Sequence, residues 1–314
     1  MKINKYILPI VLICASVFMS SCNINTDDTS RSIPNPTPPV VDDEQRLISM
    51  IKMESNDDDY TRIYYFAYDD LDRIDNINIE CNDDDYPEWV IYDIVYVSDD
   101  HIKVIMYEDN NDFYEYDLFL NEDGYIALKE NGDEYIYDNN GYLIRGEYTH
   151  LYYGVPYTDT YDIQWSNGNI FSIFEKSLYG TSTYYMQSNN KKHKMVNIDL
   201  SRYFINDQCG FCCMDNDDHW GALALLNIWG TPSNNHLTSL NYSYEGSNGS
   251  YSSHSTYDWS YDNDGYPRLC RESTDSERFY LYEISYIDET GELDPSAGKS
   301  QTQPNVAYTS LLHQ

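Results

Sequence analysis

The sequence predicts an all-β protein, in which an antiparallel meander forms a strongly curved sheet or an up-and-down barrel with one short inserted helix. Large apolar and aromatic residues alternate with polar ones over many short runs, as in strands with one buried face. Polar turns rich in Asp, Asn and Gly separate these runs, which favours antiparallel pairing of neighbouring strands. The 34 tyrosines favour sheet surfaces, because a tyrosine ring packs while its hydroxyl stays hydrated.

The first 21 residues have the organisation of a secretory signal. Lys2 and Lys5 flank the start of an apolar run that is too short to span a bilayer. Met19-Ser20-Ser21-Cys22 follows and resembles the lipobox of bacterial lipoproteins, which prefers Leu where this chain has Met19. The resemblance implies cleavage before Cys22 and lipidation of its thiol, and several acyl chains make an effectively permanent anchor. The alternative is an ordinary secretory signal followed by an incidental cysteine.

Residues 22–45 are predicted to be the lipidated Cys22 followed by a Pro-rich, acidic tether. The pair Asp27-Asp28 resembles the export signal of Bacteroidetes surface lipoproteins, which implies the outer face of the outer membrane. A tether that faces the periplasm is the alternative. We therefore expect the protein to contact a membrane through its lipid anchor, on the outer membrane and at the cell surface.

The net charge of the chain limits the kinds of partner that it can bind. The formal net charge is −34, so the surface repels nucleic acid, and we expect no nucleic-acid partner. The basic island Lys191-Lys192-His193-Lys194 is interpreted as a solvated loop.

Residues 46–288 are predicted to form a single β domain, followed by an irregular tail over residues 289–314. Residues 46–54 fit a first strand or a short helix. A hairpin unit then recurs: an aromatic, any residue, an aromatic, Asp or Asn, a short polar turn and an apolar residue. Copies lie at residues 66–74, 135–143 and 259–266, with looser copies at residues 118–126 and 163–170.

One stretch favours a helix, at about residues 219–229. It is rich in Ala and Leu, Asp217 or Asp218 can cap it, and Gly230 can end it. We expect this helix to plug one end of the curled sheet, with its inward side formed by Leu223, Leu226 and Trp229.

These features resemble a Bacteroidetes surface lipoprotein family with tyrosine–aspartate hairpin repeats, a domain of unknown function with a porin-like fold. The resemblance rests on the turns at residues 137–142 and 261–266, and on residues 197–200 and 230–237 around the Leu-rich stretch. It covers roughly residues 50–287 and implies fold and location, but no catalytic residues. The chain departs from the family in its excess of acids and tyrosines and in the cysteine cluster described next.

Cysteines and acidic runs are the residues of this chain that could form a disulfide, a redox site or a metal site. A disulfide is possible among Cys209, Cys212 and Cys213, since the predicted compartment is oxidising. The Cys209-x-x-Cys212 spacing also fits a redox dithiol, or a zinc site with His219 as a further ligand. Acidic runs are candidate calcium sites, because calcium prefers several oxygen ligands. The alternative is that these runs form solvated turns. No other cofactor is expected. The calcium candidates are Asp83, Asp84, Asp85, Asp215 and Asp217.

The sequence contains no catalytic motif that specifies an activity. Aromatic side chains on a curved sheet can stack on sugar rings while Asp and Asn bind the hydroxyls, so Trp89, Trp165 and Trp259 are candidate ligand-binding residues. Trp220 and Trp229 fit the same pattern, and core packing is the alternative for all five. The sequence thus favours a non-enzymatic, adhesin-like protein that binds a glycan or a surface protein. The alternatives are a carboxylate-dependent glycan hydrolase and a structural envelope component.

Overall fold

The computed structural model describes residues 46–56, 60–82, 89–108, 113–129, 132–152, 154–191, 194, 196–209, 221–247, 249–276 and 278–287. The predicted signal, Cys22, the tether and the tail lie outside these residues. Within the described part of the chain, no helix combines the length and hydropathy that crossing a membrane requires.

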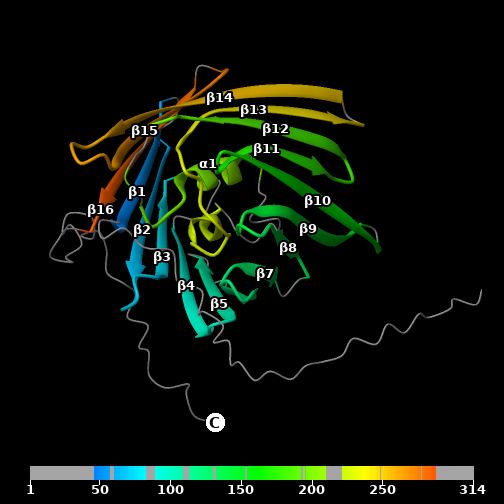
Figure 1. Cartoon of the computed structure of the whole chain (residues 1–314), viewed down its shortest axis with the longest axis horizontal. Helices are drawn as coiled ribbons and strands as arrows, with labels where there is room; N and C mark the ends of the chain where they lie inside the picture. Colours follow the sequence, from blue (N-terminus) through cyan, green and yellow to red (C-terminus); the bar gives the residue numbers. More distant parts are fainter. Residues whose placement is uncertain are drawn as a thin grey trace, which may run out of the picture. The chain divides into compact units, whose positions relative to one another are not determined.

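Sixteen strands are described, and each pairs antiparallel with the next along the chain. The first strand also pairs with the last, so the sheet closes into a barrel (Figure 1). This confirms the predicted antiparallel meander and selects the closed barrel over an open curved sheet. The strands are β1 (Ile48–Ser55), β2 (Thr61–Tyr68), β3 (Ile74–Cys81), β4 (Trp89–Ser98), β5 (His101–Glu108), β6 (Phe113–Leu120), β7 (Ile126–Lys129), β8 (Glu134–Tyr137), β9 (Leu143–Tyr152), β10 (Val155–Ser166), β11 (Asn169–Lys176), β12 (Gly180–Ser188), β13 (Leu237–Gly246), β14 (Gly249–Tyr261), β15 (Pro267–Thr274) and β16 (Phe279–Tyr286).

Side chains alternate between a buried inner face and an outer face along these strands. In β5, Ile102, Val104 and Met106 are buried, whereas His101 and Lys103 face outward beside them. The period of two follows from the pleat of an extended backbone. The core of the protein therefore lies inside the barrel.

Four turns repeat one hydrogen-bond pattern, which explains the recurring sequence unit. Each begins with Asp69, Asn121, Asp138 or Asp262, and joins a strand to the next one. The side-chain oxygen of this residue accepts the backbone N–H groups two and four residues later. The Asx side chain thus replaces backbone partners that the reversal would leave unmet.

Aromatic residues near the ends of even-numbered strands clamp the same end of the barrel. Tyr137, for example, donates its hydroxyl to the carbonyl of Ile126 at 2.7 Å, and Trp165 donates its indole N–H to the carbonyl of Leu143 at 2.8 Å. In each case the acceptor begins the preceding odd-numbered strand. The same bond is made by Tyr68, Tyr96, Trp259 and Tyr286.

The connection between β12 and β13 fills this end of the barrel, which we call the plugged end. It contains the helix α1 (Leu200–Cys209) and a 3₁₀ turn, η1 (Ala222–Leu225). Figure 1 shows α1 enclosed by the ring of strands. Asp199 caps α1, because its Oδ1 accepts the N–H of Arg202 at 3.1 Å. Most of α1 is buried, so it completes the core.

The predicted helix at residues 219–229 is wrong in position. Only Ala222–Leu225 forms a helical turn there, and residues 219 and 220 lie outside the described residues. The reason is that Gly221 and Gly230 both have positive φ values, and Leu226 is extended. The burial part of the prediction holds, since Leu223, Leu226 and Trp229 are all buried. Residues 48–55 form a strand, which resolves the two possibilities left open for residues 46–54.

Candidate functional site

The inward side of β9–β14, away from the plugged end, carries a cluster of tyrosines that we call the tyrosine face. We define it by Tyr184, Tyr242, Tyr244 and Tyr251. Strand register brings them together, since Tyr184 pairs with Tyr242 and Tyr244 pairs with Tyr251. Paired residues in an antiparallel ladder share one side of the sheet. The turn between β13 and β14 joins an odd strand to an even one, so Tyr251 lies at the end of the barrel opposite the plug.

The rings of the tyrosine face hold one another in place. Tyr184 stacks on Tyr242 with ring centroids 4.8 Å apart, and Tyr251 contacts both Tyr242 and Tyr244 at 5.4 and 5.1 Å. The hydroxyls of Tyr242 and Tyr251 are hydrogen-bonded at 2.9 Å. Despite these contacts, Tyr251 remains 59% exposed. Tyr251 thus presents a ring to solvent, whereas Tyr184 is buried beneath the cluster. Because the other rings hold that of Tyr251 in place, binding there costs little side-chain entropy.

Glu175 lies beside the tyrosine face. On β11 it pairs with Tyr161 of β10 on one side and with Ser182 of β12 on the other. Tyr184 donates its hydroxyl to Oε2 of Glu175 at 3.2 Å. Burial, with the Glu175 carboxylate adding to it, raises the pKa of Tyr161. Burial and the hydrogen bond with Tyr251 raise the pKa of Tyr242 to about 12, so this phenol stays neutral at physiological pH.

A second polar cluster, on the barrel wall, is sealed inside. Glu272 is 1% exposed, and its two oxygens accept the hydroxyls of Tyr257 and Tyr282, each at 3.1 Å. Burial and then the nearby Asp207 carboxylate raise the pKa of Glu272 to about 7. A raised pKa in a pocket is typical of a catalytic acid. Here, however, the carboxyl is almost fully buried and its two oxygens already accept the tyrosine hydroxyls, so this arrangement suits a structural role.

The structure does not assemble Trp89, Trp165 and Trp259 into one site. Trp165 and Trp259 are part-buried at the plugged end, where each indole N–H is bonded to a backbone carbonyl. Trp165 stacks on Tyr142 and Trp259 on His236. Trp89 begins β4 on its outward side, paired with Glu80. Packing thus accounts for Trp165 and Trp259.

Trp229 is fully buried, with its indole N–H bonded to the carbonyl of Leu223 at 2.6 Å. Its ring packs edge-on against Tyr135. Trp229 is therefore a core residue, whereas Trp220 lies outside the described residues.

Several other sequence candidates fall outside the part that the structure describes. Cys209 is buried at the end of α1, but its possible partners Cys212 and Cys213 are not described, so the disulfide stays a prediction. The calcium candidates Asp83, Asp84, Asp85, Asp215 and Asp217 are likewise outside. Among the described residues, no group of three or more His, Cys, Asp or Glu side chains converges as a metal site would require.

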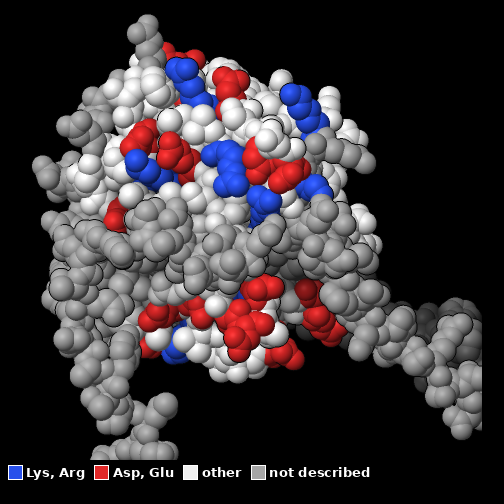
Figure 2. Space-filling view, turned by 90° about the vertical axis from the view of Figure 1, so that its left-hand side faces the viewer, with Lys and Arg blue, Asp and Glu red and all other residues white. Residues whose placement is uncertain are grey.

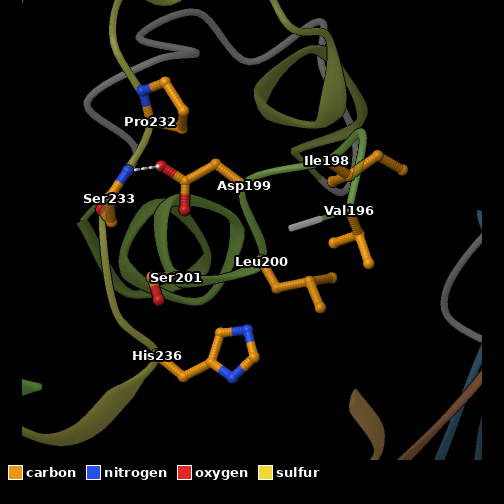
Figure 3. A pocket seen from close by; sticks show the side chains of 8 residues that line it. All are labelled: Val196, Ile198, Asp199, Leu200, Ser201, Pro232, Ser233 and His236. Atoms are coloured by element: carbon orange, nitrogen blue, oxygen red, sulfur yellow. Dashed lines mark hydrogen bonds between the residues drawn. The ribbon is translucent and has the colours of Figure 1, made fainter. Parts of the chain in front are cut away.

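A small cavity lies at the plugged end between the start of α1 and the segment that leads to β13 (Figure 3). Asp199, Ser233 and His236 contribute to its lining, and Oδ2 of Asp199 accepts the N–H of Ser233 at 2.9 Å. Its volume of about 20 Å³ suits roughly one water molecule. The cavity is too small for a larger ligand.

The outer wall of the barrel carries charged pairs between neighbouring strands. His101 is 2.6 Å from Asp117, Lys103 is 3.2 Å from Glu115, and Arg145 is 2.8 Å from Asp162. Figure 2 shows one side of the barrel, where basic and acidic groups are interspersed. Exposed apolar residues occur among them: Ile136 pairs across from Arg145, and Phe119 stacks on His101. Charged pairs and exposed apolar side chains therefore lie side by side on the described wall.

The fold is similar to that of a known crystal structure, a porin-like protein from Bacteroides uniformis. The two chains are 16% identical with a TM-score of 0.54, and the match covers 76% of this chain and 97% of the other. No family model matches the chain, and no curated protein matches it. The porin-like fold implied by the sequence resemblance is thus confirmed, whereas membership of the hairpin-repeat lipoprotein family stays a prediction.

Sequence reasoning missed the tyrosine face and favoured tryptophans instead. A signal was present, because Tyr242 and Tyr244 are two residues apart in an alternating run and therefore share one side of a strand. Tyr184 and Tyr185 are adjacent and so point to opposite sides. The sequence did not show which runs meet at the same end of the barrel.

Proposed function

We propose that this protein is a lipid-anchored outer-membrane protein whose barrel stands in water and binds a glycan on its tyrosine face. The observation that carries the proposal is the exposed ring of Tyr251, which the other tyrosines of the face hold in place, beside Glu175. The proposal has three parts, which are the lipid anchor, the outer wall that faces water and the glycan ligand.

The outer wall supports a barrel that stands in water. A transmembrane barrel has an outward apolar belt and a polar interior. This barrel differs, because it has an apolar core inside, and charged pairs such as Lys103–Glu115 and Arg145–Asp162 lie outside among exposed apolar side chains. Arg or Lys on a lipid-facing wall costs about 2–4 kcal/mol at the bilayer midplane. A porin-like fold with this wall is better suited to water than to lipid.

The direction of the chain supports an orientation for the tyrosine face. β1 begins at the plugged end, where the N–H of Ile48 is bonded to Oδ1 of Asn197 at 2.9 Å. The predicted tether precedes β1, so in an anchored protein the tether would join the barrel at this end. Tyr251 lies at the opposite end, which would then be directed away from the membrane.

The chemistry of the tyrosine face supports a glycan as its ligand. Aromatic faces carry negative partial charge and attract the polarised C–H groups of a pyranose ring. The carboxylate of Glu175, one oxygen of which accepts the hydroxyl of Tyr184, adds a hydrogen-bond acceptor at the edge of the rings. A protein ligand is the alternative occupant, but extended apolar pockets that would anchor its side chains are not seen among the described residues of this face.

The test is glycan binding by the purified full-length protein, read first on a glycan array and then by calorimetry. Replacing Tyr251 by Ala removes the most exposed ring of the face, and we expect an affinity loss of about tenfold or more. The matched control is Tyr185→Ala on the outer side of β12, because Tyr185 is 51% exposed and aromatic as well. We expect this control to bind as the wild type does.

Two results would overturn the proposal. One is an array on which no glycan binds. The other is a bound glycan whose affinity Tyr251→Ala and Tyr185→Ala change equally, since binding would then lie elsewhere. Circular dichroism of both variants checks that the barrel remains folded.

A further inference from the structure

The tyrosine face contains a charge asymmetry that bears on which glycans it accepts. The strand register of β9–β14 places two carboxylates on the inward side, Asp159 and Glu175. Among the described inward residues of these strands there is no lysine or arginine, because Arg145 and Lys176 both point outward. A ligand on the described part of this face therefore meets two carboxylates and no lysine or arginine.

Glu175 is the more central of the two carboxylates. It lies between Tyr161 and Ser182 in the sheet, and Tyr184 links it directly to the aromatic cluster. Asp159 is more peripheral, and its Oδ1 accepts the N–H of Leu178 at 3.1 Å. The phenols around Glu175 stay neutral, since burial raises the pKa values of Tyr161 and Tyr184.

We propose that Glu175 determines specificity at the tyrosine face, so that the site accepts neutral or amine-bearing glycans and rejects glycans that carry carboxylates, sulfates or phosphates. This inference rests on the proposed function. A hydroxyl of a neutral sugar donates to the carboxylate, and an ammonium group pairs with it. An anionic sugar in the same position brings like charges together on a partly buried surface, which is an effective means of rejecting a ligand.

The probes are three forms of one oligosaccharide, the neutral one with the strongest signal on the array. The second form has its primary hydroxyls oxidised to carboxylates, and the third is the methyl ester of these carboxylates. Acid and ester have similar bulk and differ in charge, so the ratio of their affinities isolates the electrostatic effect. We expect the wild-type protein to bind the ester at least about tenfold more tightly than the acid at low salt.

The variant that tests the role of Glu175 is Glu175→Gln, in which the amide oxygen can still accept the hydroxyl of Tyr184. We expect its preference for the ester over the acid, taken as the ratio of the two affinities of this variant, to shrink several-fold. The matched control is Glu245→Gln, which removes the same charge from the outward side of β13. It should keep most of the preference, which corrects for the long-range effect of net charge. Raising the salt to about 1 M should also reduce the preference, because the Debye length falls to about 3 Å.

The inference is overturned if the wild type binds acid and ester equally, or if Glu175→Gln and Glu245→Gln change the preference to the same extent. These outcomes are distinct from failure of the proposed function, in which no neutral glycan binds at all.

Discussion

The Glu272 carboxyl is an ionisable group that the fold buries, with no basic partner among the residues that the structure describes. Its ordinary pKa of 4.5 is raised to about 7, by burial first and by Asp207 second. The folded state therefore binds a proton more tightly than the unfolded state. The contribution is most favourable below pH 4.5 and declines as the pH rises to about 7, by on the order of 3 kcal/mol.

We predict that Glu272→Gln removes this dependence, because the amide has no charge to bury. The difference in free energy of unfolding between variant and wild type should grow from pH 4.5 to 7 and then level off. Urea unfolding at a series of pH values measures it. Glu283→Gln, on the exposed side of β16, is the control and should show no such growth. Parallel pH profiles for wild type and Glu272→Gln would contradict the assignment.

Residue-scale prediction from the sequence succeeded where a side chain acts on its own backbone. Asp138 and Asp262 were predicted as turn residues from their neighbours alone, and both cap their turns. It failed where function depends on which residues become neighbours. Trp165 is a larger aromatic than Tyr251, yet its indole N–H is consumed by the carbonyl of Leu143. Only the assembled strands leave Tyr251 exposed.

At the scale of elements, Asp199 connects the plug to the barrel. Its side chain caps α1 at Arg202 and accepts the N–H of Ser233. It also lies 3.5 Å from the guanidinium of Arg202, and both side chains are buried. The residue thus stabilises a helix end and a buried charge together.

We predict that Asp199→Ala lowers the free energy of unfolding by about 3 kcal/mol, because the cap is lost and Arg202 loses its buried counter-charge. Asp199→Asn keeps an acceptor for the cap and should cost less. Equilibrium urea unfolding compares the two. Equal losses would mean that the cap contributes little, and no loss in either would contradict the role assigned to Asp199.

The hairpins were predictable as elements, whereas α1 was not. Alternation and Asx turns are local signals, and the strands at residues 66–74 and 135–143 follow them. The segment Leu200–Cys209 is buried on most of its sides, so it shows no amphipathic pattern from which a helix could be read. The Leu-rich stretch near residue 223 does look helical, but Gly221 and Gly230 break it with positive φ values.

At the scale of the molecule, closure joins residues that are far apart in the chain. β1 pairs with β16, and Arg46 is paired with Asp262 and lies over the ring of Tyr266 at 4.4 Å. The need to protect sheet edges predicts closure in general terms. The strand number and the pairing across the seam are long-range properties, and no local pattern in the sequence encodes them.

The central claim is that the barrel stands in water, held to the membrane only by its N-terminal anchor. The most direct test inserts a protease site beside Asn35 in the predicted tether and cleaves the protein on isolated outer membranes. We predict that cleavage releases a folded barrel into detergent-free buffer, with glycan binding intact. A cleaved barrel that stays in the membrane at high salt and leaves it only with detergent would contradict the claim.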